Sequence, residues 1–295
     1  GCGKSALCKS IMKLLPKTAK IKSGKILVNG VDITDYTEKN MSRLRGELFS
    51  MVFQDPMTSL NPTITVGKQI GEAVRIHNKK MSRGQIRKRV IELMQLVEID
   101  RPEERIRQYP HEFSGGMRQR AVMAIALAGN PKILFADEPT TALDVTIQAQ
   151  ILDVFRRIQK KLEMATVFIS HDLGVVAGVA DRVAVMYAGK IVEIGTAEEI
   201  FYDPRHPYTW GLLQSLPVLS EGKEWLPTLP GMPPTLIHPP KGDAFAERNV
   251  YAMRIDYEKE PPMFRITDTH YAATWLLDER APKVKVSTGG RRDGK

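Results

Sequence analysis

The spacing of apolar residues along the chain predicts alternating helices and strands. From residue 4 to residue 15 they recur on one helical face, and Pro16 ends the segment. A short apolar run at residues 26–28 leads into Asn29–Gly30, which predicts a tight turn. Helical spacing returns at residues 64–110 and 114–128, and further apolar runs, typical of buried strands, lie at 48–53, 133–136, 165–170, 183–187 and 190–194. This alternation indicates an α/β fold with a mostly parallel sheet.

The composition of the chain changes after residue 203. Prolines accumulate at positions 204, 207, 217, 227, 230, 233, 234, 239 and 240. Such a stretch predicts a linker-like segment with little regular structure. Residues 287–295 contain no apolar side chain and are predicted to form a disordered tail.

Charge and composition exclude several classes of protein. The formal net charge is +9, but the densest basic run, residues 79–89, carries its apolar residues at helical spacing. Its charges are therefore interpreted as the solvated face of an amphipathic helix, and it lacks the interleaved aromatics of a single-strand binding platform. No apolar run approaches the roughly 18 to 20 residues of a membrane helix. The only cysteines, Cys2 and Cys8, argue against a disulfide framework.

The segment Gly1–Ser5 matches the second half of a phosphate-binding loop. Glycines let backbone N–H groups close around an anion, and the N-terminus of the following helix adds a partial positive charge. In this interpretation Lys4 neutralises the β- and γ-phosphates, and the Ser5 hydroxyl binds Mg²⁺. By itself, the half-motif is equally compatible with a glycine-containing turn that carries a surface lysine.

Two adjacent acids end the apolar run at residues 133–136. A strand that enters the core would deliver Asp137 and Glu138 to its carboxyl end, where open α/β sheets bind ligands. We expect Asp137 to bind Mg²⁺ and Glu138 to orient and polarise the attacking water. Burying such a pair without a cation costs several kcal/mol, so a purely structural role is the less favoured interpretation.

The segment Phe113–Arg120 is the most specific motif of the chain. Ser114 is suited to cap a helix, while Gly115 and Gly116 expose the first N–H groups of that helix to an anion. The alternative is an ordinary capped helix. Two glycines in its first turn are a poor choice for that purpose, because each costs about 1 kcal/mol relative to alanine.

Taken together and in this order, the motifs resemble those of ABC-type ATPases. The series comprises the half phosphate loop, Gln54, the signature Phe113–Met117, the acids Asp137–Glu138, the segment Thr141–Asp144 and Ser170–His171–Asp172. The signature departs slightly from the usual pattern, with Phe113 for leucine and Met117 for glutamine. The resemblance implies a RecA-like P-loop NTPase core with a mostly parallel sheet, an α-helical signature subdomain and a small irregular C-terminal domain. It also implies ATP and Mg²⁺ as cofactors.

The same resemblance implies a role for each motif residue. Glu138 and His171 are the expected catalytic residues, His171 as a contact of the γ-phosphate. Mg²⁺ would be held by Ser5, Gln54 and Asp137, and Gln54 would also sense the membrane subunit. The nucleotide-binding set comprises Gly1, Cys2, Gly3, Lys4, Ser5, Ala6, Gln54, Ser114, Gly115, Gly116 and Asp144. Of these, Ser114, Gly115 and Gly116 would complete the nucleotide site of a second ATPase subunit, and Asp144 would lie at the same interface.

Further segments are similar to the oligopeptide and dipeptide permease branch of this family, closest to its D-type subunit in Gram-positive bacteria. They lie at residues 53–62, 140–146, 203–209, 229–231 and 271–277. This implies an ATP-hydrolysing subunit of an oligopeptide importer, peripheral on the cytoplasmic face of the cell membrane. The implied partners are a paralogous ATPase subunit, two transmembrane permease subunits and, indirectly, an extracellular peptide-binding protein. No nucleic acid is expected.

One departure from many relatives concerns an iron–sulfur cluster. Where they have four cysteines, this chain has Asp243, Asn249, Asp256 and Thr274. Without thiolates, no iron–sulfur cluster is expected. The region is instead predicted to be held by packing around Phe245, Tyr251, Met253, Tyr257, Phe264 and Trp275.

The predicted domains follow the motifs. Residues 1–62 form the first part of the ATPase core, 63–129 the helical subdomain with the signature, and 130–203 the second part of the core. Residues 204–286 form the C-terminal region and 287–295 the tail. Because the chain opens without methionine inside the phosphate loop, we expect the first strands and the leading glycine of the loop to precede residue 1. We also expect the chain as given to hydrolyse ATP weakly.

Alternative functions within the family stay open at this point. A dipeptide or nickel importer would carry the same motifs. A non-transport ABC ATPase that acts on ribosomes or DNA usually has two ATPase units or a long coiled-coil insertion. This chain has one set of motifs, and no long heptad run lies between Gln54 and Ser114. A regulatory subunit that does not hydrolyse ATP is disfavoured because Glu138 and His171 are both present.

Overall fold

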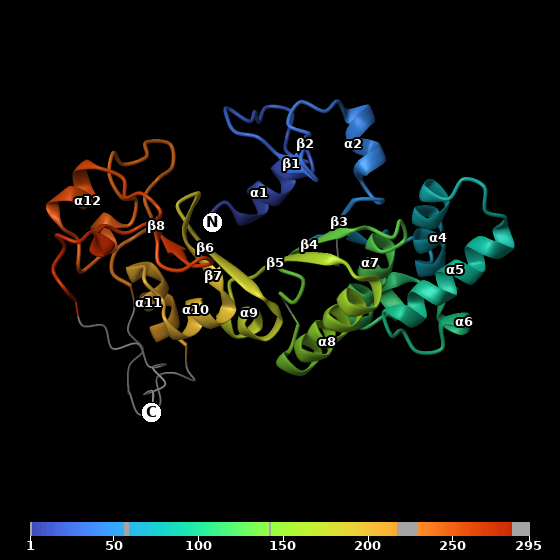
Figure 1. The fold of residues 1–295 in the computed structure, drawn as a ribbon. Coiled ribbons are helices and arrows are strands. Elements are labelled where there is room, and N and C mark those ends of the chain that lie inside the picture. Colours follow the sequence, from blue (N-terminus) through green and yellow to red (C-terminus); the bar gives the residue numbers. More distant parts are fainter. Residues whose placement is uncertain (1, 56–58, 142, 217–228, 285–295) are drawn as a thin grey trace. The chain divides into compact units, whose positions relative to one another are not determined.

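A computed structural model describes residues 2–55, 59–141, 143–216 and 229–284. The chain divides into two compact units. Figure 1 draws the ribbon coloured along the sequence. The larger unit comprises Ser5–His171, and the C-terminal unit comprises Asp172–Lys295 together with Gly1–Lys4. Gly1 and the tail 287–295 lie outside the described residues, and the domain boundaries expected from the sequence stay a prediction.

The larger unit is built on a parallel sheet in the order β3–β4–β5. Its strands are β3 (Phe49–Val52), β4 (Ile133–Asp137) and β5 (Ala165–Ile169). Successive residues of β4 point to opposite faces, so Leu134 and Ala136 enter one apolar cluster and Phe135 enters another. A central strand buried on both faces is typical of a parallel α/β sheet.

Helices cover this sheet and extend beyond it. Before β3 come α1 (Lys4–Ile11), the hairpin β1 (Leu27–Val28) and β2 (Val31–Asp32), and α2 (Glu38–Leu44). Between β3 and β4 lie α4 (Val66–His77), α5 (Arg83–Leu96), α6 (Pro102–Arg105) and α7 (Gly115–Ala126), and α8 (Val145–Leu162) connects β4 to β5. Helices α4 and α5 pack on each other and on α7 through apolar residues that are continuous with the sheet cluster (Figure 1).

Strand β5 differs from its prediction as a buried strand. It pairs with β4 along one edge, and its residues alternate in burial, with Val167 41% exposed. Among the described residues β5 has a paired strand on one side only and keeps part of its surface exposed, which a continuous apolar run in the sequence does not reveal.

The C-terminal unit contains an antiparallel sheet in the order β6–β7–β9–β8. Its strands are β6 (Arg182–Tyr187), β7 (Lys190–Thr196), β8 (Phe264–Arg265) and β9 (Tyr271–Ala272), and its helices are α9 (Leu173–Val179), α10 (Ala197–Tyr202), α11 (Pro207–Gln214) and α12 (Arg254–Glu258). Both strands expected at residues 183–194 are present. They run antiparallel because only Ala188 and Gly189, both with positive φ, connect them, as in a two-residue hairpin.

The proline-rich segment is more regular than its composition predicts. Pro207 occupies the first turn of α11, where its missing N–H costs no hydrogen bond. The side chain of His206 caps the helix by accepting the N–H of Tyr208 at 3.0 Å. Trp210 is buried and donates its indole N–H to the carbonyl of Pro204 at 2.8 Å. The prolines here therefore fix a helix start, while residues 217–228 lie outside the described part.

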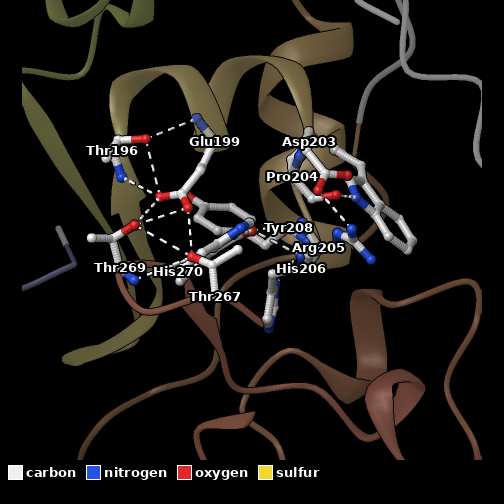
Figure 2. A network of polar contacts seen from close by, with 12 residues as sticks. Thr196, Glu199, Asp203, Pro204, Arg205, His206, Tyr208, Thr267, Thr269 and His270 are labelled. Carbon is white, nitrogen blue, oxygen red and sulfur yellow. Dashed lines mark hydrogen bonds and ion pairs between the residues drawn. The ribbon is translucent and has the colours of Figure 1, made fainter. Parts of the chain in front are cut away.

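A buried carboxylate joins three segments of the C-terminal unit. The side chain of Glu193, on β7, is fully buried and accepts the backbone N–H groups of Arg205 at 2.6 Å and His206 at 3.1 Å. Its Oε1 also lies 2.8 Å from Nε2 of His270, which is fully buried as well. Figure 2 shows these two histidines beside α10 and the start of α11. Burial lowers the pKa of His206 to about 3, so this ring is neutral.

A second carboxylate, Glu199 at the start of α10, is held by hydroxyl groups (Figure 2). It forms a capping box with Thr196 and accepts hydrogen bonds from the hydroxyls of Thr267 at 2.6 Å and Thr269 at 2.9 Å. Burial acts to raise the pKa of Glu199, but these hydrogen bonds together lower it to about 2. The contacts tie the segment before β9 to the end of β7.

The four positions where many relatives carry cysteine are buried and polar. Asp243, Asn249, Asp256 and Thr274 each accept a backbone N–H from two or three residues away along the chain. Burial raises the pKa of Asp243 to about 6, and the charges of Asp256 and Glu260 act in the same direction. These side chains offer carboxylate, amide and hydroxyl groups, a donor set that does not fit an iron–sulfur cluster.

The aromatic packing expected in this region is present only in part. Phe245 is buried, Tyr251 lies edge-on to Trp210, and Phe264 lies edge-on to Trp275. Tyr257 is 55% exposed, so its expected place in the packing is wrong. The turns capped by the four polar residues order a region that was predicted to be held by packing around Met253 and five aromatic side chains.

Candidate active site

The start of α1 meets the end of β4. Gly3, with φ +89°, takes a left-handed conformation that favours glycine and lets the chain enter the helix at Lys4. The Ser5 hydroxyl donates to Oδ1 of Asp137 at 2.7 Å, although 132 residues separate them in sequence. Asp137, the last residue of β4, is 3% exposed. A hydroxyl and a carboxylate brought together are hard oxygen ligands of the kind that Mg²⁺ prefers.

Glu138 is held from three directions. Its Oε2 accepts from Nε2 of Gln54 at 3.0 Å and from the hydroxyl of Thr141 at 3.1 Å. Its Oε1 lies 3.3 Å from Nδ1 of His171. Gln54 follows β3, His171 follows β5, and Glu138 itself follows β4. Parallel strands end at one edge of a sheet, which is why these side chains meet.

The backbone at Glu138 is unusual. Its φ is +48°, a left-handed value that a residue with a side chain rarely adopts. Its N–H continues the parallel ladder by donating to the carbonyl of Ile169 at 3.0 Å. Its side chain is 18% exposed, against 67% for His171. A non-glycine residue held in such a conformation costs roughly 1–3 kcal/mol and often marks a functional site.

The signature residues begin α7. Ser114 caps the helix by accepting the N–H of Met117 at 3.3 Å. A Cβ atom on Gly116 would lie 2.7 Å from Cγ2 of Ile147 on α8, and one on Gly115 would lie 3.4 Å from Cδ2 of Leu143. The glycines therefore also have a packing role that the sequence did not reveal: Gly116 lets α7 approach the start of α8 closely.

Asp144 lies at that start of α8. Its Oδ1 accepts the N–H of Ile147 at 2.9 Å, which caps the helix. In the described part of the chain, no hydrogen bond joins Asp144 or Ser114–Gly116 to Ser5, Asp137, Glu138 or His171. The structure thus separates the expected site residues into a group around Glu138 and a group at the starts of α7 and α8.

The remaining residues of the phosphate loop are placed as follows. Cys2 accepts the N–H of Gly189 through its carbonyl at 3.1 Å, within the C-terminal unit. Ala6 lies exposed in the first turn of α1, and the ammonium of Lys4 has no side-chain partner among the described residues. Cys8, one turn after Ser5, is buried. Burial, assisted by the charge of Asp137, raises the pKa of its thiol to about 11, which makes it a poor nucleophile.

Thr141 contacts the carboxylate of Glu138, although the motifs in the sequence imply no separate role for it. Its position three residues after Glu138 is the only local signal. That spacing closes a turn in which the N–H of Thr141 donates to the carbonyl of Glu138 at 3.2 Å.

Comparison with known proteins decides the family. The general model of the ABC transporter family matches residues 1–141, and the model of the oligopeptide/dipeptide transporter C-terminal region matches residues 192–255. The oligopeptide transport ATP-binding protein OppD of Bacillus subtilis is 61% identical over 97% of this chain and 80% of its own length. The chain belongs to the ABC transporter ATP-binding proteins of the oligopeptide/dipeptide family.

Other members of the ABC family agree with this assignment. The dipeptide transport ATP-binding protein DppD of Lactococcus lactis is 57% identical over 97% of this chain and 82% of its own length. One similar solved structure is that of the dimeric ATP-binding cassette MJ0796 in a post-hydrolysis state, bound to ADP and Pi. Its sequence is 25% identical to this chain, and the TM-score is 0.57 for an alignment that covers 66% of this chain and 81% of that one. The predicted family and fold class are confirmed, and membership of the ABC ATPases implies ATP binding.

No helix in the described part of this ABC protein is long and apolar enough to span a membrane.

Proposed function

We propose that this chain hydrolyses ATP to drive import of oligopeptides, as a peripheral subunit on the cytoplasmic face of the membrane. The arrangement of Ser5 on Asp137, with Gln54, Thr141 and His171 around Glu138, carries the ATPase part of this proposal. The family model over residues 192–255 and the 61% identical oligopeptide relative support the peptide part.

Each residue of the site would have a separate role in phosphoryl transfer. The N–H groups at the start of α1 and the ammonium of Lys4 would bind the β- and γ-phosphates. Ser5 and Asp137 would hold Mg²⁺, which when bound neutralises charge on the phosphate oxygens. Gln54 donates to Glu138 rather than to Asp137, so its proposed contact with Mg²⁺ requires that it turn from Glu138.

Glu138 would accept a proton from the attacking water or orient it toward the γ-phosphorus. One ring nitrogen of His171 lies 3.3 Å from Oε1 of Glu138, and the other nitrogen would donate to the γ-phosphate. Because little covalent chemistry is required of the protein, positioning and charge stabilisation would account for most of the acceleration.

The second group of residues requires a second cassette. The first N–H groups of α7, next to Ser114, Gly115 and Gly116, would bind the γ-phosphate of a nucleotide held by a partner subunit, and Asp144 would lie at the same interface. Val145, beside Asp144, is 83% exposed, as expected of a residue that a partner covers. The related dimeric cassette supports this assembly. A paralogous partner would make the two sandwiched sites unequal.

The contact surface for the permease subunits is proposed to lie on α4 and α5. These helices, with residues 64–65 and 106–107, line a hollow of about 630 Å³ whose apolar lining side chains are Ile64, Ile86, Val90 and Ile106. Five cations line it without a side-chain partner among the described residues: Lys68, Arg75, Arg83, Arg87 and Arg107. The one acid in the lining is Glu72. Such a groove fits an amphipathic segment with acidic side chains on its rim.

Reversing two of these charges tests the surface. The double variant Arg83→Glu, Arg87→Glu is expected to weaken copurification with the permease subunits at least about 10-fold, because like charges would face the acidic rim. The matched control is Lys88→Glu on the same helix, which is exposed and does not line the hollow. Equal loss in the control, or none in the double variant, would contradict this surface.

The experiment that tests the function is ATP hydrolysis by the subunit assembled with its partner ATPase and permease subunits. Addition of a peptide-loaded binding protein is expected to raise the rate several-fold. Stimulation by dipeptides alone, or by a nickel-loaded binding protein, would instead favour a related importer. Hydrolysis indifferent to every loaded binding protein would contradict import and favour a non-transport ABC ATPase. Weak hydrolysis by the 295-residue chain as given stays a prediction.

A further inference from the structure

The carboxylate of Glu138 has more partners than its proposed chemistry requires. Gln54 and Thr141 both donate to Oε2, at 3.0 Å and 3.1 Å, while His171 contacts Oε1. A glutamate side chain turns about three bonds, so one contact leaves its orientation free. Two donors on one oxygen and a third group on the other fix the plane of the carboxylate.

The three partners differ in what else they are proposed to do. Gln54 would turn toward Mg²⁺ and the membrane subunit, and His171 would turn toward the γ-phosphate. Either movement weakens its hold on Glu138. Thr141 alone belongs to the same turn as Glu138, since its own N–H donates to the Glu138 carbonyl at 3.2 Å. Its hydroxyl therefore stays with the carboxylate while the other two partners exchange contacts.

We propose that Thr141 is a positioning residue for hydrolysis, whose hydroxyl keeps the Glu138 carboxylate oriented toward the water through the nucleotide cycle. This inference rests on the proposed role of Glu138. It predicts a loss in kcat rather than in nucleotide affinity, because the Thr141 hydroxyl hydrogen-bonds Glu138 and, among the described residues, neither the phosphate loop nor Asp137.

Three variants test this role in the assembled transporter. Thr141→Val keeps the branched shape and removes the hydroxyl, and it is expected to lower kcat about 10-fold while KM for ATP stays within about 2-fold. Thr141→Ser keeps the hydroxyl and is expected to retain at least about half of the rate. The matched control is Thr140→Val, because the adjacent Thr140 hydroxyl has no hydrogen-bond partner among the described residues.

A double variant separates positioning from a general structural effect. If Thr141 acts through Glu138, adding Thr141→Val to Glu138→Gln lowers the residual rate no further. A wild-type rate in Thr141→Val, a serine variant as slow as the valine variant, or a full 10-fold loss on top of Glu138→Gln would each overturn the inference. Full activity of Glu138→Gln alone would instead contradict the proposed function of Glu138, so the two failures are distinguishable.

Discussion

Replacing Glu138 by glutamine is expected to lower ATP hydrolysis by the assembled transporter about 100-fold or more, with ATP binding retained. A positioned general base contributes roughly 10²–10⁴-fold to a rate. Glutamine has nearly the same volume and keeps one carbonyl oxygen that can accept from Gln54 and Thr141. The change therefore removes the charge and basicity of the side chain while leaving its surroundings nearly intact. Steady-state phosphate release and equilibrium nucleotide binding, measured on the same preparation, give both quantities.

Glu163 provides a matched control for that experiment. It has the same left-handed backbone, with φ +48°, at the end of α8, but its side chain is exposed and has no partner among the described residues. Glu163→Gln is expected to leave hydrolysis unchanged. If Glu138→Gln hydrolyses ATP as fast as the wild type, the proton acceptor lies elsewhere and the proposed catalytic assignment is wrong.

Removing the buried carboxylate of Glu193 is expected to give the largest loss of stability. In Glu193→Ala, the N–H groups of Arg205 and His206 and the ring of His270 lose their common partner inside the protein. Breaking a buried pair by removing one member typically costs about 3–5 kcal/mol, because the other member stays buried and unsatisfied. We expect a decrease of this size in the free energy of unfolding of the C-terminal unit.

Tryptophan fluorescence during urea unfolding measures this change selectively. The two tryptophans in the described part of the chain, Trp210 and Trp275, belong to the C-terminal unit, and Trp225 lies outside the described residues. Glu198→Ala, which removes an exposed carboxylate from the first turn of α10, is the control and is expected to cost less than about 1 kcal/mol. Glu193→Gln should lie between the two, since its amide oxygen can still accept. A loss below about 1 kcal/mol in Glu193→Ala would show that the network contributes little to stability.

The sequence predicted the local parts of the site well because they depend on a few neighbouring residues. Apolar runs identified the strands that end at Val52, Asp137 and Ile169. Ser114 caps a helix, as predicted from a short polar residue before a helical pattern. The order of the motifs was sufficient to predict the family, which close relatives confirm.

Other expectations failed where burial decided the outcome. Tyr257 was expected in the packing and is exposed, and β5 was expected to be buried but alternates in burial, with Val167 41% exposed. Neither result can be predicted from the neighbouring residues, because the sequence does not show whether another strand or helix covers an apolar side chain. In the sequence, Asp243 and Asp256 stood out only because many relatives have cysteine there, and the turns that they cap were not predicted.

What the sequence by itself determined is which chemical groups the chain has and which strand or helix carries each. Only the tertiary structure decided which groups meet: Ser5 with Asp137 across 132 residues, and Thr141, Gln54 and His171 on one carboxylate. It also separated two similar acids, burying Glu193 completely and leaving Glu199 within reach of solvent. The physical reason is that backbone geometry fixes contacts over a few residues. Contacts between distant segments depend on how strands pair and side chains pack, which no single segment encodes.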